Sequence, residues 1–322
     1  MMISVKRYDE NFKDQWNELI YKSKNGSFLF NRDFLEYHSN RFEDFSLLIF
    51  FNNNLISVLP ANIVENTLYS HQGLSYGGFV LLNDLKLNTI KDIVKESLIF
   101  LEKNNIDKIY IKFIPKMYHS QPSDELDWVM FKLKAELYRR DTALVINKKS
   151  LRLNYQERRI RSIKKVDPNK VCIKEGKLEF EPFWNKILIP NLELKHGVKP
   201  VHSLSEILLL SNLFPKNIKQ YNIYIENKIV AGCTIFQYNK VVHCQYISGS
   251  LIGRDSGCLD YLFNYLINDN FFEFDYFDFG ICNENEGKDL NFGLLDWKEG
   301  FGARTISHDF YKVNSSNYFL LD

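Results

Sequence analysis

The stretch Val241–Ile267, VVHCQYISGSLIGRDSGCLDYLFNYLI, decides the fold. Its first eight residues predict a strand, and the apolar spacing from Leu259 to Ile267 predicts an amphipathic helix. The loop between them contains Gly253, Arg254 and Gly257. A strand that enters a helix through such a loop presents unpaired backbone N–H groups and the positive end of a helix dipole. This arrangement favours binding of phosphate or pyrophosphate, to which Arg254 can add a bidentate contact.

A second informative stretch follows at Tyr276–Ala303, YFDFGICNENEGKDLNFGLLDWKEGFGA. An aromatic strand, Tyr276–Gly280, runs into an asparagine-rich loop and then into an amphipathic helix that stops at Gly-Phe-Gly. An open, hydrogen-bonding loop at the end of a buried strand suggests a ligand site. The alternative is a turn whose Asn side chains bond their own backbone.

The two halves of the chain repeat one pattern of elements. Each contains a strand, an asparagine-containing turn and further strands, with Asn53-Asn54 and Asn227-Lys228 at the first turns. An amphipathic helix, a strand, another helix and a closing strand then follow in each half. The sequence therefore predicts an α+β protein of two units, residues 1–149 and 150–322, each a mixed, mostly antiparallel sheet flanked by helices.

The composition argues against several classes of protein. With 41 basic and 40 acidic residues, the net charge of +1 gives no support for a nucleic-acid partner. No signal peptide and no membrane span is expected, and five scattered cysteines without a CxxC pair predict neither a disulfide framework nor a metal site. A protein of the reducing cytoplasm fits these features best. There is no P-loop and no GxGxxG fingerprint.

Arg254-x-x-Gly257 after a strand resembles the pyrophosphate loop of the GNAT superfamily of acyl-CoA-dependent N-acyltransferases, although Leu259 stands where that family has Gly or Ala. The duplication, with phrases such as YSHQGLSYGGFVLL, ERRIRSIKK, KHGVKPVHSLSEI and the stretch from Tyr276, resembles the tandem-GNAT, FemAB-like branch. Within it, the chain is most similar to bacterial enzymes that N-acylate nucleotide-linked amino sugars for surface polysaccharides such as O-antigen and lipopolysaccharide.

This resemblance implies that the fourth and fifth strands of the second unit splay apart, with the pantetheine arm of acyl-CoA between them. Acyl-CoA is then the co-substrate and no metal is needed. The residues expected to contact it are Tyr246, Ile247, Ser248, Gly253, Arg254, Ser256, Gly257, Cys258, Asn283 and Asn285. For the chemistry, the candidates for moving protons are His243, Tyr246, Asp278 and Glu284. Each has an ordinary structural alternative, such as a packed tyrosine or an acid bonded to backbone.

The first unit lacks an Arg-x-x-Gly loop, so we expect it to help hold the acceptor. Its candidate residues lie in SHQGLSYGGFV and IPKMYHSQPSDELDW, and two more segments of the second half add basic and histidine side chains. The residues expected to bind the acceptor are His71, Gln72, Tyr76, Tyr118, His119, Arg158, Arg159, His196 and His202. Arg158 and Arg159 also fit the solvated face of a helix, Ser123 and Ser203 fit helix caps, and His196 fits a surface loop.

The resemblance implies two possible activities, and a third possibility is binding alone. The first is transfer of an acyl group from acyl-CoA to the amine of a dTDP- or UDP-linked amino sugar by direct attack in a ternary complex. The second is FemAB-type aminoacyl transfer to peptidoglycan precursors, whose enzymes carry a long helical hairpin for which this chain has no charged heptad segment. The third is a tandem-GNAT protein that binds without catalysis. The partners expected are small molecules, with neither nucleic acid nor membrane, and the oligomeric state is open.

Overall fold

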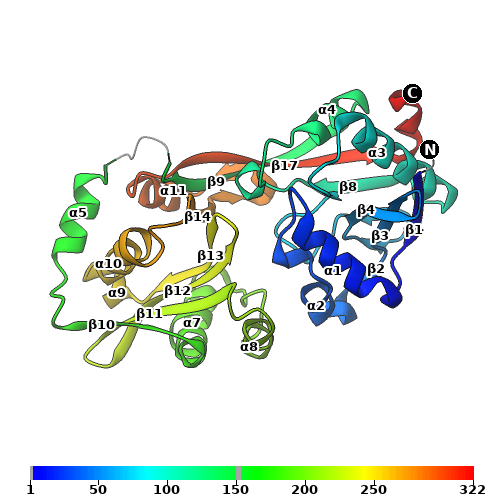
Figure 1. The fold of residues 1–322 in the computed structure, drawn as a ribbon. Coiled ribbons are helices and arrows are strands. Elements are labelled where there is room, and N and C mark those ends of the chain that lie inside the picture. Colours follow the sequence, from blue (N-terminus) through cyan, green and yellow to red (C-terminus); the bar gives the residue numbers. More distant parts are fainter. Residues whose placement is uncertain (1–2, 150–153) are drawn as a thin grey trace. The chain divides into compact units, whose positions relative to one another are not determined.

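The computed structural model describes residues 3–149 and 154–322, which form two compact units (Figure 1). Unit 1 contains the chain up to Asp141 together with Asn285–Lys288 and Ser307–Asp322. Unit 2 contains Thr142–Glu284 and Asp289–Ile306. This division differs from the expected boundary between residues 149 and 150, because the end of the chain returns to the first unit.

The closing strands explain the difference. Strand β9 (Glu136–Asn147) begins in unit 1, but its last residues pair antiparallel with β14 (Tyr276–Ile281) of unit 2. Strand β17 (Arg304–Asn314) begins in unit 2, but its last residues pair antiparallel with β8 (Lys108–Lys112) of unit 1. Each half of the sequence therefore supplies the closing strand of the other unit. Periodicity predicts such strands but not their partners.

Unit 1 carries four described α-helices and two groups of strands. The helices are α1 (Lys13–Lys22), α2 (Arg32–Leu35), α3 (Leu87–Lys103) and α4 (Glu125–Lys132). The remaining strands are β1 (Ile3–Arg7), β2 (Glu43–Asp44), β3 (Leu47–Phe51), β4 (Asn54–Leu59), β5 (Asn62–Val64), β6 (Thr67–Tyr69) and β7 (Val80–Leu81). Strands β1-β3-β4-β7 form one sheet, and β17-β8-β6-β5-β2 are neighbours in another. Of the described pairings in this unit, β6–β8 is parallel.

The core of unit 1 lies between these strands and α3. Ile90, Ile93, Leu98 and Leu101 form a buried helical stripe against strand residues such as Ile109. The first hairpin turns one residue earlier than the sequence suggested. Asn52 and Asn53 both have positive φ (47° and 69°), as a two-residue hairpin turn requires, whereas Asn54 already belongs to β4.

Unit 2 carries the second set of elements. Its helices are α5 (Glu157–Lys164), α6 (Phe180–Phe183), α7 (Ile189–His196), α8 (Leu204–Leu213), α9 (Leu251–Asp255), α10 (Cys258–Tyr265) and α11 (Phe292–Glu299), with π-helical turns at η6 (Trp184–Leu188) and η7 (Leu266–Asn270). Its strands are β10 (Val171–Glu175), β11 (Ile218–Ile225), β12 (Lys228–Tyr238), β13 (Val241–Gly249), β14, β15 (Asn283–Glu284) and β16 (Asp289–Leu290).

The sheet of unit 2 has the order β10-β11-β12-β13-β14-β9. In Figure 1 the strands β11–β13 lie between α10 on one side and α7 and α8 on the other. Leu262, Phe263 and Leu266 are fully buried against strand residues, which confirms the amphipathic helix predicted after Cys258. The helix cap predicted at Ser203 is also present, and it is part of a capping box, because the side chain of Ser203 and that of Glu206 cap each other's backbone.

Strands β13 and β14 run parallel and then separate. Their described pairing covers three positions, from Val241↔Tyr276 to His243↔Asp278. Beyond this point β13 continues to Gly249 while remaining paired with β12, and the β13–β12 register shifts at Gln245. Within the described residues, no pairing joins the two strands further on. The predicted separation of the fourth and fifth strands of the second unit is confirmed.

Candidate functional site

The opening between β13 and β14 is the candidate site of unit 2. A strand that loses its neighbour leaves backbone N–H and C=O groups without a ladder partner on that side. Gln245–Gly249 provide this edge on β13, and the end of β14 provides the opposite edge. Such an opening accepts an extended ligand that carries amides of its own, by the pairing that adds a strand to a sheet.

His243 and Asp278 close the narrow end of this opening. The Nδ1 atom of His243 lies 2.7 Å from Oδ2 of Asp278, whose side chain is 4% exposed. The other carboxylate oxygen, Oδ1, accepts the backbone N–H of Gly280 at 2.7 Å. Because a carboxylate accepts, Nδ1 of His243 carries the proton, and the lone pair of the neutral ring is on Nε2. The side chain of His243 remains 20% exposed, so solvent or substrate reaches it.

Lys298 of α11 holds the end of β14. Its ammonium donates to the carbonyl oxygens of Gly280 at 2.9 Å and Ile281 at 2.8 Å, and the thiol of Cys282 lies beside it. Lys298 as a whole is 2% exposed, and burial lowers its pKa. A buried ammonium bonded to two carbonyls satisfies groups that a departing strand would otherwise leave without partners.

Sequence reasoning missed Lys298, although the pattern contains a signal for it. In the helix pattern LLDWKEGF, a lysine occupies the position between Leu295 and Phe301 where helical spacing calls for an apolar residue. Phe301 is 1% exposed, so this is the buried stripe of α11. A charged residue on a buried stripe needs a specific partner, and here the partners are the carbonyls of β14.

Tyr246 and His202 meet on the α7 and α8 side of the sheet. The Tyr246 hydroxyl lies 2.6 Å from Nδ1 of His202 and accepts the backbone N–H of the same residue at 3.1 Å. The hydroxyl therefore donates to Nδ1. The indole N–H of Trp184 donates to the His202 carbonyl at 3.1 Å, and its ring packs edge-on against Tyr246. Burial raises the pKa of Tyr246 to about 12, so the phenol keeps its proton.

The loop between β13 and α10 packs closely against backbone carbonyl groups. Arg254 donates from Nη1 to the carbonyl of Gly249 at 2.5 Å and stays exposed. A Cβ atom at Gly253 would lie 2.2 Å from the Val230 carbonyl oxygen. Gly257 has a φ of +83°, and a Cβ there would lie 2.2 Å from the Ser162 carbonyl oxygen. Both glycines thus have a packing reason, beside any role in holding phosphate.

Further residues expected to contact acyl-CoA lie on β13, in the loop after it and at the start of α10. The Ser248 hydroxyl accepts from Nδ2 of Asn191 at 2.8 Å, a contact from α7 that the sequence did not suggest. Ile247 is half-buried on β13, Ser256 is half-buried in the loop, and Cys258 is buried at the start of α10. Burial raises the pKa of the Cys258 thiol.

The asparagine-rich loop divides between the two units. The side-chain oxygen of Asn283 accepts from the backbone N–H of Thr142 at 2.7 Å and from its hydroxyl at 2.9 Å, so Asn283 anchors β9. Glu284 is exposed and accepts from Asn291 at 2.9 Å. Asn285 has a φ of 49° and belongs to unit 1.

The two arginines of the basic run contact neighbouring helices. Arg159 pairs with Asp260 of α10 at 2.5 Å, and Asp260 also accepts the indole N–H of Trp297 at 2.8 Å. Arg158 forms an ion pair with Asp296 and donates to its carbonyl at 2.8 Å. In this structure both side chains therefore tie α5 to α10 and α11. His196 ends α7, and its side chain lies outside what the structure describes.

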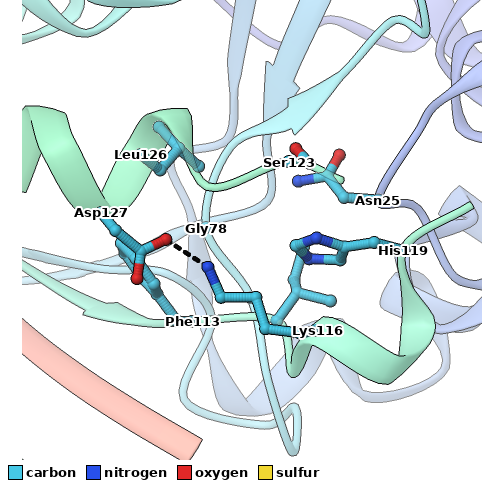
Figure 2. Close-up of a pocket in the computed structure, with 10 residues that line it drawn as sticks. Asn25, Gly78, Phe113, Lys116, His119, Ser123, Leu126 and Asp127 are labelled. Atoms are coloured by element: carbon cyan, nitrogen blue, oxygen red, sulfur yellow. Dashed lines mark hydrogen bonds and ion pairs between the residues drawn. The ribbon is translucent and has the colours of Figure 1, made fainter. Parts of the chain in front are cut away.

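In unit 1 the structure brings together the two stretches singled out for the acceptor. The rings of Tyr76 and Tyr118 are 4.7 Å apart, and both are buried, so neither has an open face for stacking. Figure 2 shows a small pocket lined by Gly78, His119, Lys116 and Asp127 among others. Lys116 is paired with Asp124 and Asp127. Burial, and then the charge of Lys116, lower the pKa of His119 to about 4.

The loop that contains His71 and Gln72 is held by Lys112. The ammonium of Lys112 donates to the carbonyls of His71, Gln72 and Leu74 at 3.4, 3.1 and 2.7 Å. The backbone N–H of Gln72 donates to Oδ1 of Asn62 at 2.8 Å, and Nδ2 of Asn62 donates to Oε1 of Gln72 at 2.9 Å. His71 is 4% exposed, has a φ of 63°, and has its pKa lowered to about 3 by burial.

Among the described residues, no group of three or more His, Cys, Asp or Glu side chains is placed to hold a metal ion. None of the described helices is both long and apolar enough to cross a membrane.

The chain is similar to several solved structures over nearly its whole length. FemX aligns over 99% of both chains with a TM-score of 0.68 at 9% identity. L-PGS from Bacillus licheniformis aligns over 95% of this chain and 92% of its own, with a TM-score of 0.61 at 10% identity. A tandem GNAT protein from the clavulanic acid biosynthesis pathway aligns over 98% and 99%, with a TM-score of 0.55 at 9% identity. No family model and no curated protein sequence matches the chain.

These similarities define the fold: two tandem GNAT-like units, each a mixed and mostly antiparallel sheet flanked by helices. The fold class predicted from the sequence is confirmed. At such identities the likeness concerns the fold alone, so the activity has to be argued from the site.

Proposed function

We propose that this protein is a GNAT-type acyltransferase that moves an acyl group from a carrier to an amine. The observation that carries the proposal is the opening between β13 and β14 with His243 and Asp278 at its closed end. An extended thioester carrier can pair its amides with the edge of β13, which brings its carbonyl toward the imidazole. A fixed geometry of this kind can contribute about 7–11 kcal/mol to lowering a barrier.

The residues of the opening support direct transfer. Nε2 of His243 accepts the proton that the amine loses when its nitrogen attacks the carbonyl carbon, while Asp278 stabilises the resulting imidazolium. Backbone N–H groups on β13 near Tyr246–Ser248 stabilise the oxyanion. The carbon–sulfur bond then breaks, and the leaving thiolate takes a proton from solvent or from the Tyr246 hydroxyl, whose raised pKa keeps it protonated.

For the two substrates we propose acyl-CoA and a dTDP- or UDP-linked amino sugar, as the sequence resemblance implies. The setting is surface polysaccharide synthesis in the cytoplasm. In this proposal Arg254 contacts the CoA pyrophosphate, and Gln72 and His119 of unit 1 contribute to acceptor binding. His71, Tyr76 and Tyr118 support that region by packing, because all three side chains are buried.

A second candidate is aminoacyl transfer from aminoacyl-tRNA to a peptidoglycan precursor. It is supported by the likeness to FemX over nearly the full length of both chains, which fits this candidate about as well as the first. The same His243–Asp278 pair would accept the proton of the attacking amine, because attack on an ester and on a thioester needs the same base. The third reading, binding without catalysis, predicts ligand binding but no turnover.

The deciding experiment compares donors on the purified protein. With acetyl-CoA and a panel of dTDP- and UDP-linked amino sugars, we expect release of free thiol that requires the sugar. With aminoacyl-tRNA and a UDP-linked peptidoglycan precursor, deacylation that requires the precursor would instead support the second candidate. Binding without turnover in either arm would support the third. If no donor binds, the acyltransferase proposal is wrong.

A further inference from the structure

Helix α7 and the loop after β13 meet at one carbonyl group, that of Gly249. Nδ2 of Asn191 donates to this oxygen at 3.0 Å, and Nη1 of Arg254 donates to it at 2.5 Å. Asn191 is thereby fixed at the open end of β13, and so is the face of α7 on which it lies. Lys195 follows Asn191 by one helical turn and shares that face.

Lys195 and Arg254 therefore lie on two elements that are joined through the Gly249 carbonyl. Burial, and then the charge of Arg254, lower the pKa of Lys195. Within residues 3–149 and 154–322, neither cation has a carboxylate at ion-pair distance. Glu193 and Asp255, which lie near them in the sequence, form no described ion pair with them. Like charges that are held together without a counter-ion destabilise each other until an anion binds.

We propose that Lys195 and Arg254 together bind the phosphate group of the acyl carrier, with Lys195 as a binding residue that the loop motif does not include. The proposal rests on the proposed function, since it places the anionic part of the donor. Arg254 uses one of its five N–H donors on Gly249, so the others remain available for a bidentate contact. Lys195 adds a compact charge from the opposite element.

The length of the opening fits this placement. Gly249 lies six residues beyond His243 on β13, which corresponds to about 20 Å at a rise of about 3.3 Å per residue. An extended pantetheine arm has thirteen bonds between its sulfur and the first phosphorus, which corresponds to roughly 16 Å at about 1.2 Å per bond. A carrier whose carbonyl lies near the His243 end therefore places its phosphate near Gly249.

Two carriers share this chemistry, the pyrophosphate of CoA and the phosphodiesters at the 3′ end of an aminoacylated RNA. The experiment measures dissociation constants of the full chain for CoA, for pantetheine, which lacks phosphate, and for an RNA hairpin with a tRNA acceptor end. The variants are Lys195→Ala, Arg254→Ala and the double variant. Lys186→Ala, which removes another exposed lysine of unit 2, is the matched control.

We expect Lys195→Ala to weaken binding of the phosphate-containing carrier about tenfold, as the loss of a charged hydrogen bond implies. Pantetheine binding should change less than twofold, and Lys186→Ala should match the wild type. Weakening with CoA alone assigns the pair to CoA, and weakening with RNA alone assigns it to RNA. If the wild type binds a carrier but Lys195→Ala binds it equally well, the inference is wrong while the proposed function stands. If the wild type binds neither carrier, the proposed function itself fails.

Discussion

Nδ1 of His243 lies 2.7 Å from Oδ2 of Asp278, and the same two residues form the last described pair between β13 and β14. The point at which the strands separate is therefore also the point at which an imidazole is oriented. This is a suitable place for proton transfer, because Asp278 fixes the ring through Nδ1 while the side chain of His243 stays 20% exposed.

His243→Gln should lower turnover by about 10²–10⁴-fold with little change in the Michaelis constant for the carrier. The general base is lost, while the opening between β13 and β14 that binds the carrier remains. Steady-state kinetics over a range of pH measure this. The variant should also lose the acidic limb of the pH–rate profile, which a merely structural role would not affect. Wild-type turnover in His243→Gln would exclude the imidazole as the base.

Lys298→Met should lower the free energy of unfolding by about 2–4 kcal/mol, because two buried carbonyls of β14 lose their donor. Urea unfolding followed by circular dichroism measures this. Lys164→Met, which changes an exposed lysine of α5, is the matched control and should differ from the wild type by less than about 0.5 kcal/mol. Equal midpoints for the two variants would contradict the bonding seen at Gly280 and Ile281.

Gly257→Ala should destabilise unit 2 by about 2 kcal/mol or more. The new Cβ would lie 2.2 Å from the Ser162 carbonyl oxygen, and a φ of +83° is strained for alanine. Gly293→Ala is the control, because Gly293 is inside α11, where the nearest atom to a new Cβ is 3.7 Å away. That variant should be neutral or more stable by up to about 1 kcal/mol. A stable Gly257→Ala protein would contradict the packing of α5 against α10.

Acid should destabilise unit 1 through His71 and His119. Their pKa values in the folded state are about 3 and about 4, against 6.5 for an ordinary histidine. The unfolded chain therefore binds more protons below pH 6.5, and stability is lost as pH falls from 6.5 toward 4, by about 1.4 kcal/mol per pH unit for each group once well below 6.5.

The measurement is the unfolding free energy between pH 7 and pH 4.5. His71→Asn removes one titrating group, and asparagine tolerates the positive φ of this position. The slope of stability against pH should become shallower in this variant, and more so when His119→Asn is added. An unchanged slope in the double variant would show that other groups cause the acid sensitivity.

The spacing of hydrophobic residues in the sequence was sufficient to predict many of the helices and strands. The spacing of Leu262, Phe263 and Leu266 located α10, and the alternation from Val241 located β13, because both patterns reflect burial on one face. The turn at Asn53 was off by one residue, since a hairpin turn needs two consecutive residues with positive φ and the sequence offers three asparagines in a row.

The site was less predictable. His243 and Asp278 could be named from their strands, but their 2.7 Å contact depends on a parallel register that joins residues 35 positions apart. Lys298 could have been suspected from its place on a buried helical stripe, but its partners, two backbone carbonyls of β14, could not be read from the sequence. Asn191 carries no such signal, because its contacts with Ser248 and Gly249 depend on how α7 packs against β13. Arg159 was expected at the acceptor and is paired with Asp260, since a charged helix face alone does not reveal which neighbour it meets.

The exchange of β9 and β17 has a consequence for how the gene can be divided. Cutting between the repeats, at residue 149, yields an N-terminal fragment that retains β9 but lacks β17, the partner of β8. The C-terminal fragment retains β17 but lacks β9, the partner of β14. Neither fragment keeps all the strands of its unit, so truncating or transplanting one half of the chain by itself removes a strand that the other half pairs with.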